Sequence, residues 1–140
     1  MITLKDYYMG RDETYKSLLT PQLRANASIT VASANWLLNA AVSGGIYLEV
    51  HPESKTLVTS GWRPPAVNAA TPTAAKNSKH MTCEAIDIYD ADGDLDEWCI
   101  DHLDVLEKLG LWLEHPSATL RGWCHVQTVA PRSGKRVFYP

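Results

Sequence analysis

The sequence lacks any long apolar run. No stretch approaches the roughly 20 consecutive apolar residues that a membrane-spanning helix needs. The first residues, Met1 to Tyr8, have neither the basic start nor the apolar core of a secretion signal. We therefore expect a protein without a membrane span that is made and folded in the cytoplasm. A substrate outside the membrane would be reached only with the help of another protein.

Cysteine and positive charge are also scarce. The three cysteines are an odd number and form no C-x-x-C pair, which favours reduced thiols over a disulfide framework. The formal net charge of -3 at pH 7 excludes the broad basic surface that binding to phosphate backbones requires. We expect no nucleic-acid partner. One short basic cluster near the C-terminus fits a solvated turn: Arg132, Lys135 and Arg136.

The length fits one domain. A chain of 140 residues, 45% of them hydrophobic, can bury a sufficient core without disulfides. We predict a single domain over residues 1–140. Within it, residues 1–45 are predicted to be helical, and residues 46–140 are predicted to hold a sheet and a metal site. We find no repeat, linker or low-complexity segment.

Local signals predict helices in the N-terminal segment. Pro21 follows Thr20, as at the start of a helix, and Gly44 marks its end. Residues 4–19 predict one or two shorter helices broken around Gly10.

Alternating apolar residues predict strands in the C-terminal segment. The predicted strands are 46–50, 57–62, 84–89, 111–114, 123–128 and 136–139. Between them we expect an ordered loop over 64–78 with at most a short helix, and an amphipathic helix over 95–109. This order predicts an α+β fold whose mainly antiparallel sheet carries helices on one face.

Residues that bind metals recur among the predicted strands. His80 and Asp87 lie in one segment, and His125 follows on a later strand. Zinc accepts imidazole and carboxylate, and catalytic zinc sites use three protein ligands plus water. On spacing alone, a buried histidine bonded to a carbonyl beside a turn aspartate remains the simpler interpretation. A zinc thiolate stays open for Cys83, whereas strand alternation turns Cys124 away from the face of His125.

Three linked motifs resemble a known family. They are S-G-W-R-P-P at 60–65, N-S-x-H with A-x-D between 77 and 87, and W-x-H at 123–125. Together they resemble the zinc D-alanyl-D-alanine carboxypeptidases and L-alanyl-D-glutamate endopeptidases that act on peptidoglycan. Hedgehog signalling domains resemble this family's fold. The likeness runs from about Leu57 to the C-terminus, and residues 9–12 and 19–21 are similar to short phage-type members.

The resemblance implies roles for several residues. It implies one zinc ion per chain, held by the two histidines and the aspartate named above. Arg63 would bind a carboxylate or carbonyl of the stem peptide, since a guanidinium can hold a carboxylate bidentately. Ser78 would steady the ligand loop by hydrogen bonding. Ser78 and Gln127, which shares a strand face with His125, are also predicted substrate contacts.

Two positions depart from the family pattern. Many relatives carry glycine where Cys83 stands, and many carry an acid, the general base, where this chain has Gly122. The base must therefore come from elsewhere. We predict Glu114, because a carboxylate can take a proton from zinc-bound water of pKa about 7 and pass it to the leaving amine. His115 and Glu84 are the alternatives.

The sequence thus predicts a zinc peptidase of the peptidoglycan stem peptide. We favour a monomeric phage or prophage endolysin, an L-alanyl-D-glutamate endopeptidase that a holin releases to the cell wall in the periplasm. The alternatives are a D-alanyl-D-alanine carboxypeptidase and, in another class, a zinc-binding or cell-wall-binding module that has lost catalysis. The acidic residues between 90 and 96 favour a turn and an Asp cap over a calcium loop, because Gly93 falls at the fourth position rather than the sixth and no Glu stands at the twelfth.

Overall fold

A computed structural model describes residues 1–118 and 122–140 of the chain. Its strands form one sheet in the order β1-β2-β4-β3-β5. Strand β5 runs parallel to β3, and the other pairings are antiparallel. The predicted α+β fold with a mainly antiparallel sheet is therefore confirmed. The strands span Val58–Ser60 (β1), Ala85–Asp90 (β2), Trp112–Glu114 (β3), Gly122–Gln127 (β4) and Val137–Phe138 (β5).

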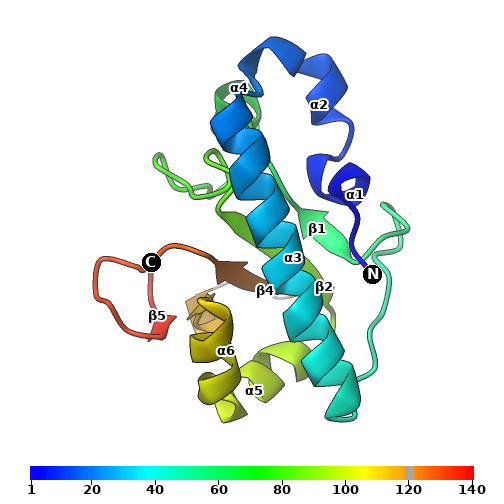
Figure 1. The fold of residues 1–140 in the computed structure, drawn as a ribbon, viewed down its shortest axis with the longest axis vertical. Coiled ribbons are helices and arrows are strands. Elements are labelled where there is room, and N and C mark those ends of the chain that lie inside the picture. Colours follow the sequence, from blue (N-terminus) through cyan, green and yellow to red (C-terminus); the bar gives the residue numbers. More distant parts are fainter. Residues whose placement is uncertain (119–121) are drawn as a thin grey trace.

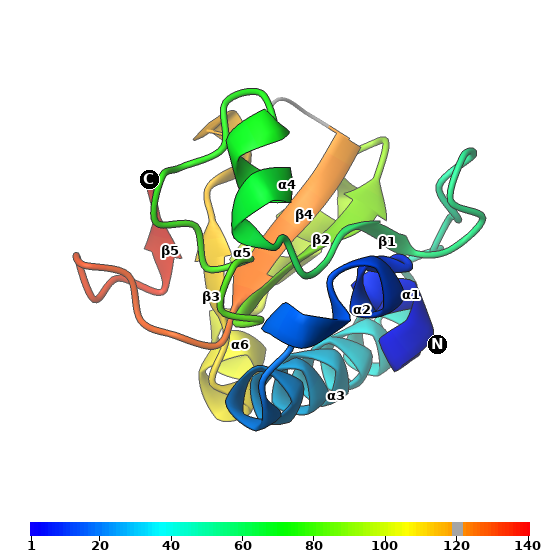
Figure 2. The same ribbon diagram turned by 90° about the horizontal axis from the view of Figure 1, so that it is seen from above.

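The larger helices pack on one face of this sheet. Helices α3 (Pro21–Ser43), α5 (Asp94–Asp101) and α6 (Leu103–Leu109) lie on that face (Figure 1). The short helix α4 (Pro65–Ala70) lies on the opposite side (Figure 2). The core fills the space between α3 and the sheet and includes Leu37, Leu38, Ile86, Ile88, Cys124 and Val126, all fully buried. None of the described helices is both long and apolar enough to cross a membrane.

The N-terminal helices agree with the local signals. Helices α1 (Leu4–Tyr8) and α2 (Arg11–Thr14) are separated at Gly10, whose φ of 78° is in the left-handed region. A short 3-10 turn, Lys16–Leu18, follows. Thr20 then caps α3, because its hydroxyl accepts a hydrogen bond from the Leu23 amide at 3.2 Å. The predicted start and end of the long helix are confirmed.

The strand expected at 46–50 is wrong. Ile46 and Leu48 do pack against the core, which explains the alternating pattern. The segment nevertheless forms no part of the sheet, and Tyr47, Glu49 and Val50 are exposed. Alternation reports which side chains are buried, but a strand also needs a neighbour for its backbone hydrogen bonds.

The single helix expected at 95–109 is also wrong. It divides into α5 and α6 at His102, where φ is -128° and ψ is 50°. The His102 ring stacks on Trp98 with centroids 4.1 Å apart, and its Nδ1 donates to the Trp98 carbonyl at 2.7 Å. A side chain bonded to a carbonyl four residues earlier offers the chain an alternative to a continuous helix.

Candidate metal centre

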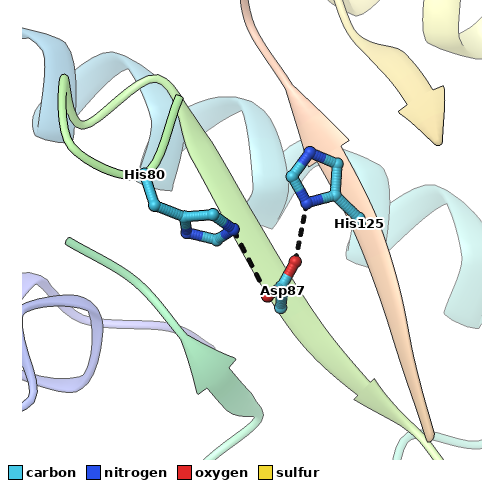
Figure 3. A group of neighbouring side chains, drawn as sticks. All are labelled: His80, Asp87 and His125. Carbon is cyan, nitrogen blue, oxygen red and sulfur yellow. Dashed lines mark hydrogen bonds and ion pairs between the residues drawn. The ribbon is translucent and has the colours of Figure 1, made fainter. Parts of the chain in front are cut away.

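Strand pairing places an aspartate beside a histidine on the sheet face away from α3. Asp87 of β2 is paired with His125 of β4. Their strand neighbours Ile86 and Val126 point into the core, so Asp87 and His125 point the other way. His80 reaches the same place from the turn before β2 (Figure 3).

These three side chains converge and form what we call the His–Asp–His cluster (His80, Asp87 and His125). His80 Nε2 lies 3.3 Å from Asp87 Oδ2, and His125 Nδ1 lies 2.7 Å from Asp87 Oδ1. The candidate ligand atoms all lie within 4.8 Å of one another. The cluster contains the residues that the sequence predicts as ligands and does not include Cys83.

His80 turns an unprotonated nitrogen toward Asp87. Its Nδ1 lies 2.8 Å from the Gly61 carbonyl oxygen, and because a carbonyl only accepts, Nδ1 carries the proton. The neutral ring then has a lone pair on Nε2, a buried atom without a hydrogen-bond partner. This nitrogen and the Asp87 carboxylate are both electron-pair donors, so a cation between them would satisfy both. The donor set fits a metal ion.

Gln127 fixes the ring of His125 in a similar way. The Gln127 amide nitrogen donates to the Val129 carbonyl at 2.7 Å, which leaves Oε1 facing His125 Nε2 at 3.3 Å. His125 Nε2 therefore donates, and Nδ1 is the nitrogen directed at Asp87. Gln127 is only 5% exposed, and both ends of its amide bond within the protein. These two hydrogen bonds hold the imidazole of His125 in one orientation. The role of Gln127 as a substrate contact stays a prediction.

The charges of the cluster suit metal binding. Burial opposes the ionisation of Asp87, but the two histidines hold its pKa well below the usual range. Burial lowers the pKa of His80, which keeps that ring neutral. For His125, burial is outweighed by the hydrogen bond to Asp87, so its pKa is raised. A metal and a proton compete for His125 Nδ1, so the affinity for the metal should fall as the pH falls.

Glu114 lies beside the cluster. Leu113 of β3 pairs with Val126 of β4, which puts Glu114 next to His125 on the open face of the sheet. Its Oε2 is 3.9 Å from His125 Nδ1, and its side chain is 16% exposed. Burial raises the pKa of Glu114, so this carboxylate is a stronger base than one in water.

The two alternative bases, His115 and Glu84, do not face the His–Asp–His cluster as Glu114 does. His115 Nδ1 is 2.8 Å from the Ser117 hydroxyl, and its ring stacks on Tyr139 at 4.8 Å. Glu84 has the same strand parity as the core residue Ile86, opposite to that of Asp87. Of the three acids and imidazoles considered, Glu114 has the geometry of a base at this cluster.

Arg63 is buried near the cluster. It is 9% exposed, and its Nη1 donates to the Asn68 side-chain oxygen at 3.3 Å. Asn68 in turn donates to the Ala75 carbonyl at 2.9 Å, which links the arginine to the loop after α4. Burial lowers the pKa of Arg63, while Asp87 and Glu114 act in the opposite direction. No local sequence signal marks Asn68, because its partners depend on how the loop after α4 folds back.

The loop that carries His80 contains two further residues of interest. One, Ser78, makes the hydrogen bond expected of it, and the other, Cys83, departs from the glycine of many relatives. The Ser78 hydroxyl accepts a hydrogen bond from the His80 amide at 3.2 Å. Cys83 has a φ of 58°, a left-handed conformation that glycine adopts most easily. This explains why glycine suits the position. Burial raises the pKa of the Cys83 thiol to about 12, which disfavours the thiolate that a zinc ligand requires.

Comparison with protein families identifies the class. The family model described as Peptidase M15 matches residues 22–103, more than half of the chain. The chain therefore belongs to the peptidase M15 family, a family of zinc-dependent peptidases, in agreement with the resemblance seen in its motifs. The matched segment includes Arg63, His80 and Asp87, whereas Glu114 and His125 lie beyond it. No curated protein and no solved structure matched this chain.

Proposed function

We propose that this protein is a zinc peptidase that hydrolyses an amide bond in the stem peptide of peptidoglycan. The observation that carries the proposal is a partly buried carboxylate, that of Glu114, which lies beside the His–Asp–His cluster. Membership of a peptidase family supports the reaction class. One zinc ion per chain would be held by His80, Asp87 and His125.

Each residue of the site has a separate task in this mechanism. His80, Asp87 and His125 would hold a zinc ion, which would act as a Lewis acid on the scissile carbonyl and would lower the pKa of water. Glu114 accepts the proton of the attacking water and delivers it to the leaving nitrogen. Arg63 holds a carboxylate or carbonyl of the substrate with its guanidinium. Gln127 and the Gly61 carbonyl keep the two imidazoles in the orientation that binding needs.

Within this reaction class we favour an endolysin that cleaves the L-alanyl-D-glutamate bond. Such a protein would act as a monomer on the cell wall, in the periplasm, after a phage or prophage holin has released it. The alternative is a D-alanyl-D-alanine carboxypeptidase. The alternative of another class is a zinc-binding or cell-wall-binding module without catalysis, which Gly122 favours. The carboxylate of Glu114 near His125 supports an enzyme instead.

Digestion of purified murein tests the proposal. The protein is incubated with murein before and after chelation, and after zinc is restored, and the released muropeptides are identified by mass spectrometry. We expect zinc-dependent release with a new N-terminal D-glutamate. Loss of terminal D-alanine would assign the carboxypeptidase instead, and zinc binding without any released fragment would contradict a peptidase.

A further inference from the structure

A second arginine lies close to Arg63. Arg11 belongs to α2, more than fifty residues earlier in the chain, and its Nη1 donates to the Trp62 carbonyl at 2.7 Å. That carbonyl belongs to the peptide bond that leads into Arg63. Arg11 is partly buried, and Arg63 is 9% exposed. We call these two side chains the paired-guanidinium site.

The paired-guanidinium site has no counterion within the described chain. Among residues 1–118 and 122–140, no carboxylate oxygen lies within 4.0 Å of either guanidinium. The Nε of Arg63 is buried and has no hydrogen-bond partner. Burial lowers the pKa of Arg11, and the positive charge of Arg63 lowers it further. Holding two positive charges close together away from water is unfavourable in electrostatic free energy. An anion between them would remove this penalty.

The nearby acids do not replace such an anion. Asp87 and Glu114 interact electrostatically with Arg63, but neither carboxylate forms an ion pair with its guanidinium. A divalent ion held by the His–Asp–His cluster would add two positive charges beside these carboxylates and would offset their attraction for Arg63. The site as a whole would then attract a substrate anion.

The chemistry of the stem peptide supplies an anion of suitable kind. In an L-alanyl-γ-D-glutamyl bond, the carbon attached to the leaving nitrogen also carries a free carboxylate. The terminal residue of a D-alanyl-D-alanine bond has the same arrangement. We propose that Arg11 and Arg63 together bind this carboxylate, which makes Arg11 a specificity-determining residue. The inference rests on the proposed function for its substrate, but it concerns binding and can be measured without hydrolysis.

Calorimetry with matched peptides tests the proposal. The titrated protein is the zinc-loaded full chain carrying Glu114→Gln, so that cleavage does not consume the ligand. The ligands are L-Ala-γ-D-Glu-L-Lys with a free α-carboxylate and the same peptide with an α-carboxamide. A second pair of ligands is a pentapeptide ending in D-Ala-D-Ala and the same peptide with a C-terminal amide. This pair tests whether the carboxylate comes from the terminal D-alanine instead.

We expect the free acid to bind about 10- to 100-fold more tightly than the amide, the scale of a charge-assisted hydrogen bond. Adding Arg11→Gln should lower this ratio several-fold by weakening only the acid, and the preference that remains is the share of Arg63. Arg11→Lys should leave an intermediate ratio, because a point charge persists without the planar fork. The control Arg132→Gln, which removes a charge from an exposed position, should leave the ratio unchanged.

Several results would overturn the inference. Equal weakening of acid and amide by Arg11→Gln would mean that Arg11 only anchors α2 to the Trp62 carbonyl. If Arg11→Gln fails to fold, Arg11→Lys replaces it in the test. An unchanged ratio of acid to amide affinity in Arg11→Lys would also contradict the inference. Hydrolysis by the unsubstituted protein without preference for the acid would refute the paired site and leave the proposed function standing. A preference for the acid in binding, without any hydrolysis, would support the paired site and refute the proposed function.

Discussion

Replacing Glu114 by glutamine tests the proposed base most directly. Glutamine keeps the size of the side chain and most of its hydrogen bonding, but it cannot accept the proton of the attacking water. General acid–base catalysis contributes about 10² to 10⁴ in rate, which is about 3 to 5 kcal/mol of activation free energy. We expect a loss within this range.

The pH dependence gives an independent check. A base works only when ionised, so kcat/KM rises as the pH increases through the pKa of Glu114. Burial raises that pKa above its ordinary value of 4.5, which moves the acidic limb of the profile upward. In Glu114→Gln this limb should vanish. Zinc content is measured at each pH, because protonation of the histidines also releases the metal.

The neighbouring histidine provides the control. His115→Ala removes an imidazole that contacts Ser117 and Tyr139, so it should keep more than a tenth of the rate and retain the acidic limb. If both variants keep more than about a tenth of the rate, the loss is too small for a general base. The assignment of Glu114 would then be wrong, and Glu84 or water alone would become the better explanation.

Further substitutions examine the remaining features of the site and the fold. Alanine at any position of the His–Asp–His cluster should abolish tight zinc binding in metal analysis, whereas Cys83→Ser should keep full occupancy. Arg63→Lys should cost about 2 to 3 kcal/mol in kcat/KM while the melting temperature holds, and wild-type rates would assign Arg63 to a structural role. Gln127→Leu should weaken zinc binding about 10- to 100-fold in chelator competition, and Gln127→Glu, which keeps an acceptor for His125, should restore it. Burial raises the pKa of Asp96 from 3.8 to about 7, so the folded state keeps a proton that the unfolded chain loses, and stability should fall as the pH rises through that interval. Asp96→Asn should therefore raise the melting temperature at about pH 8 and change it little at about pH 4.

The sequence by itself determined the features that depend on neighbouring residues. Thr20 and Pro21 define the start of α3 because a cap and a first-turn proline act within one helical turn. The alternation in β2 and β4 separated Asp87 and His125 from the core side chains beside them. The motifs also identified the family, because their order along the chain is a property of the sequence.

The tertiary structure decided what depends on distant contacts. The segment 46–50 alternates like a strand, but only the fold shows that its backbone lies outside the sheet. The position of Glu114 follows from the pairing of β3 with β4, and the tautomer of His80 follows from a carbonyl 19 residues away. Hydrogen bonds and electrostatic interactions act through space, so residues far apart in the chain set the protonation and basicity of the site.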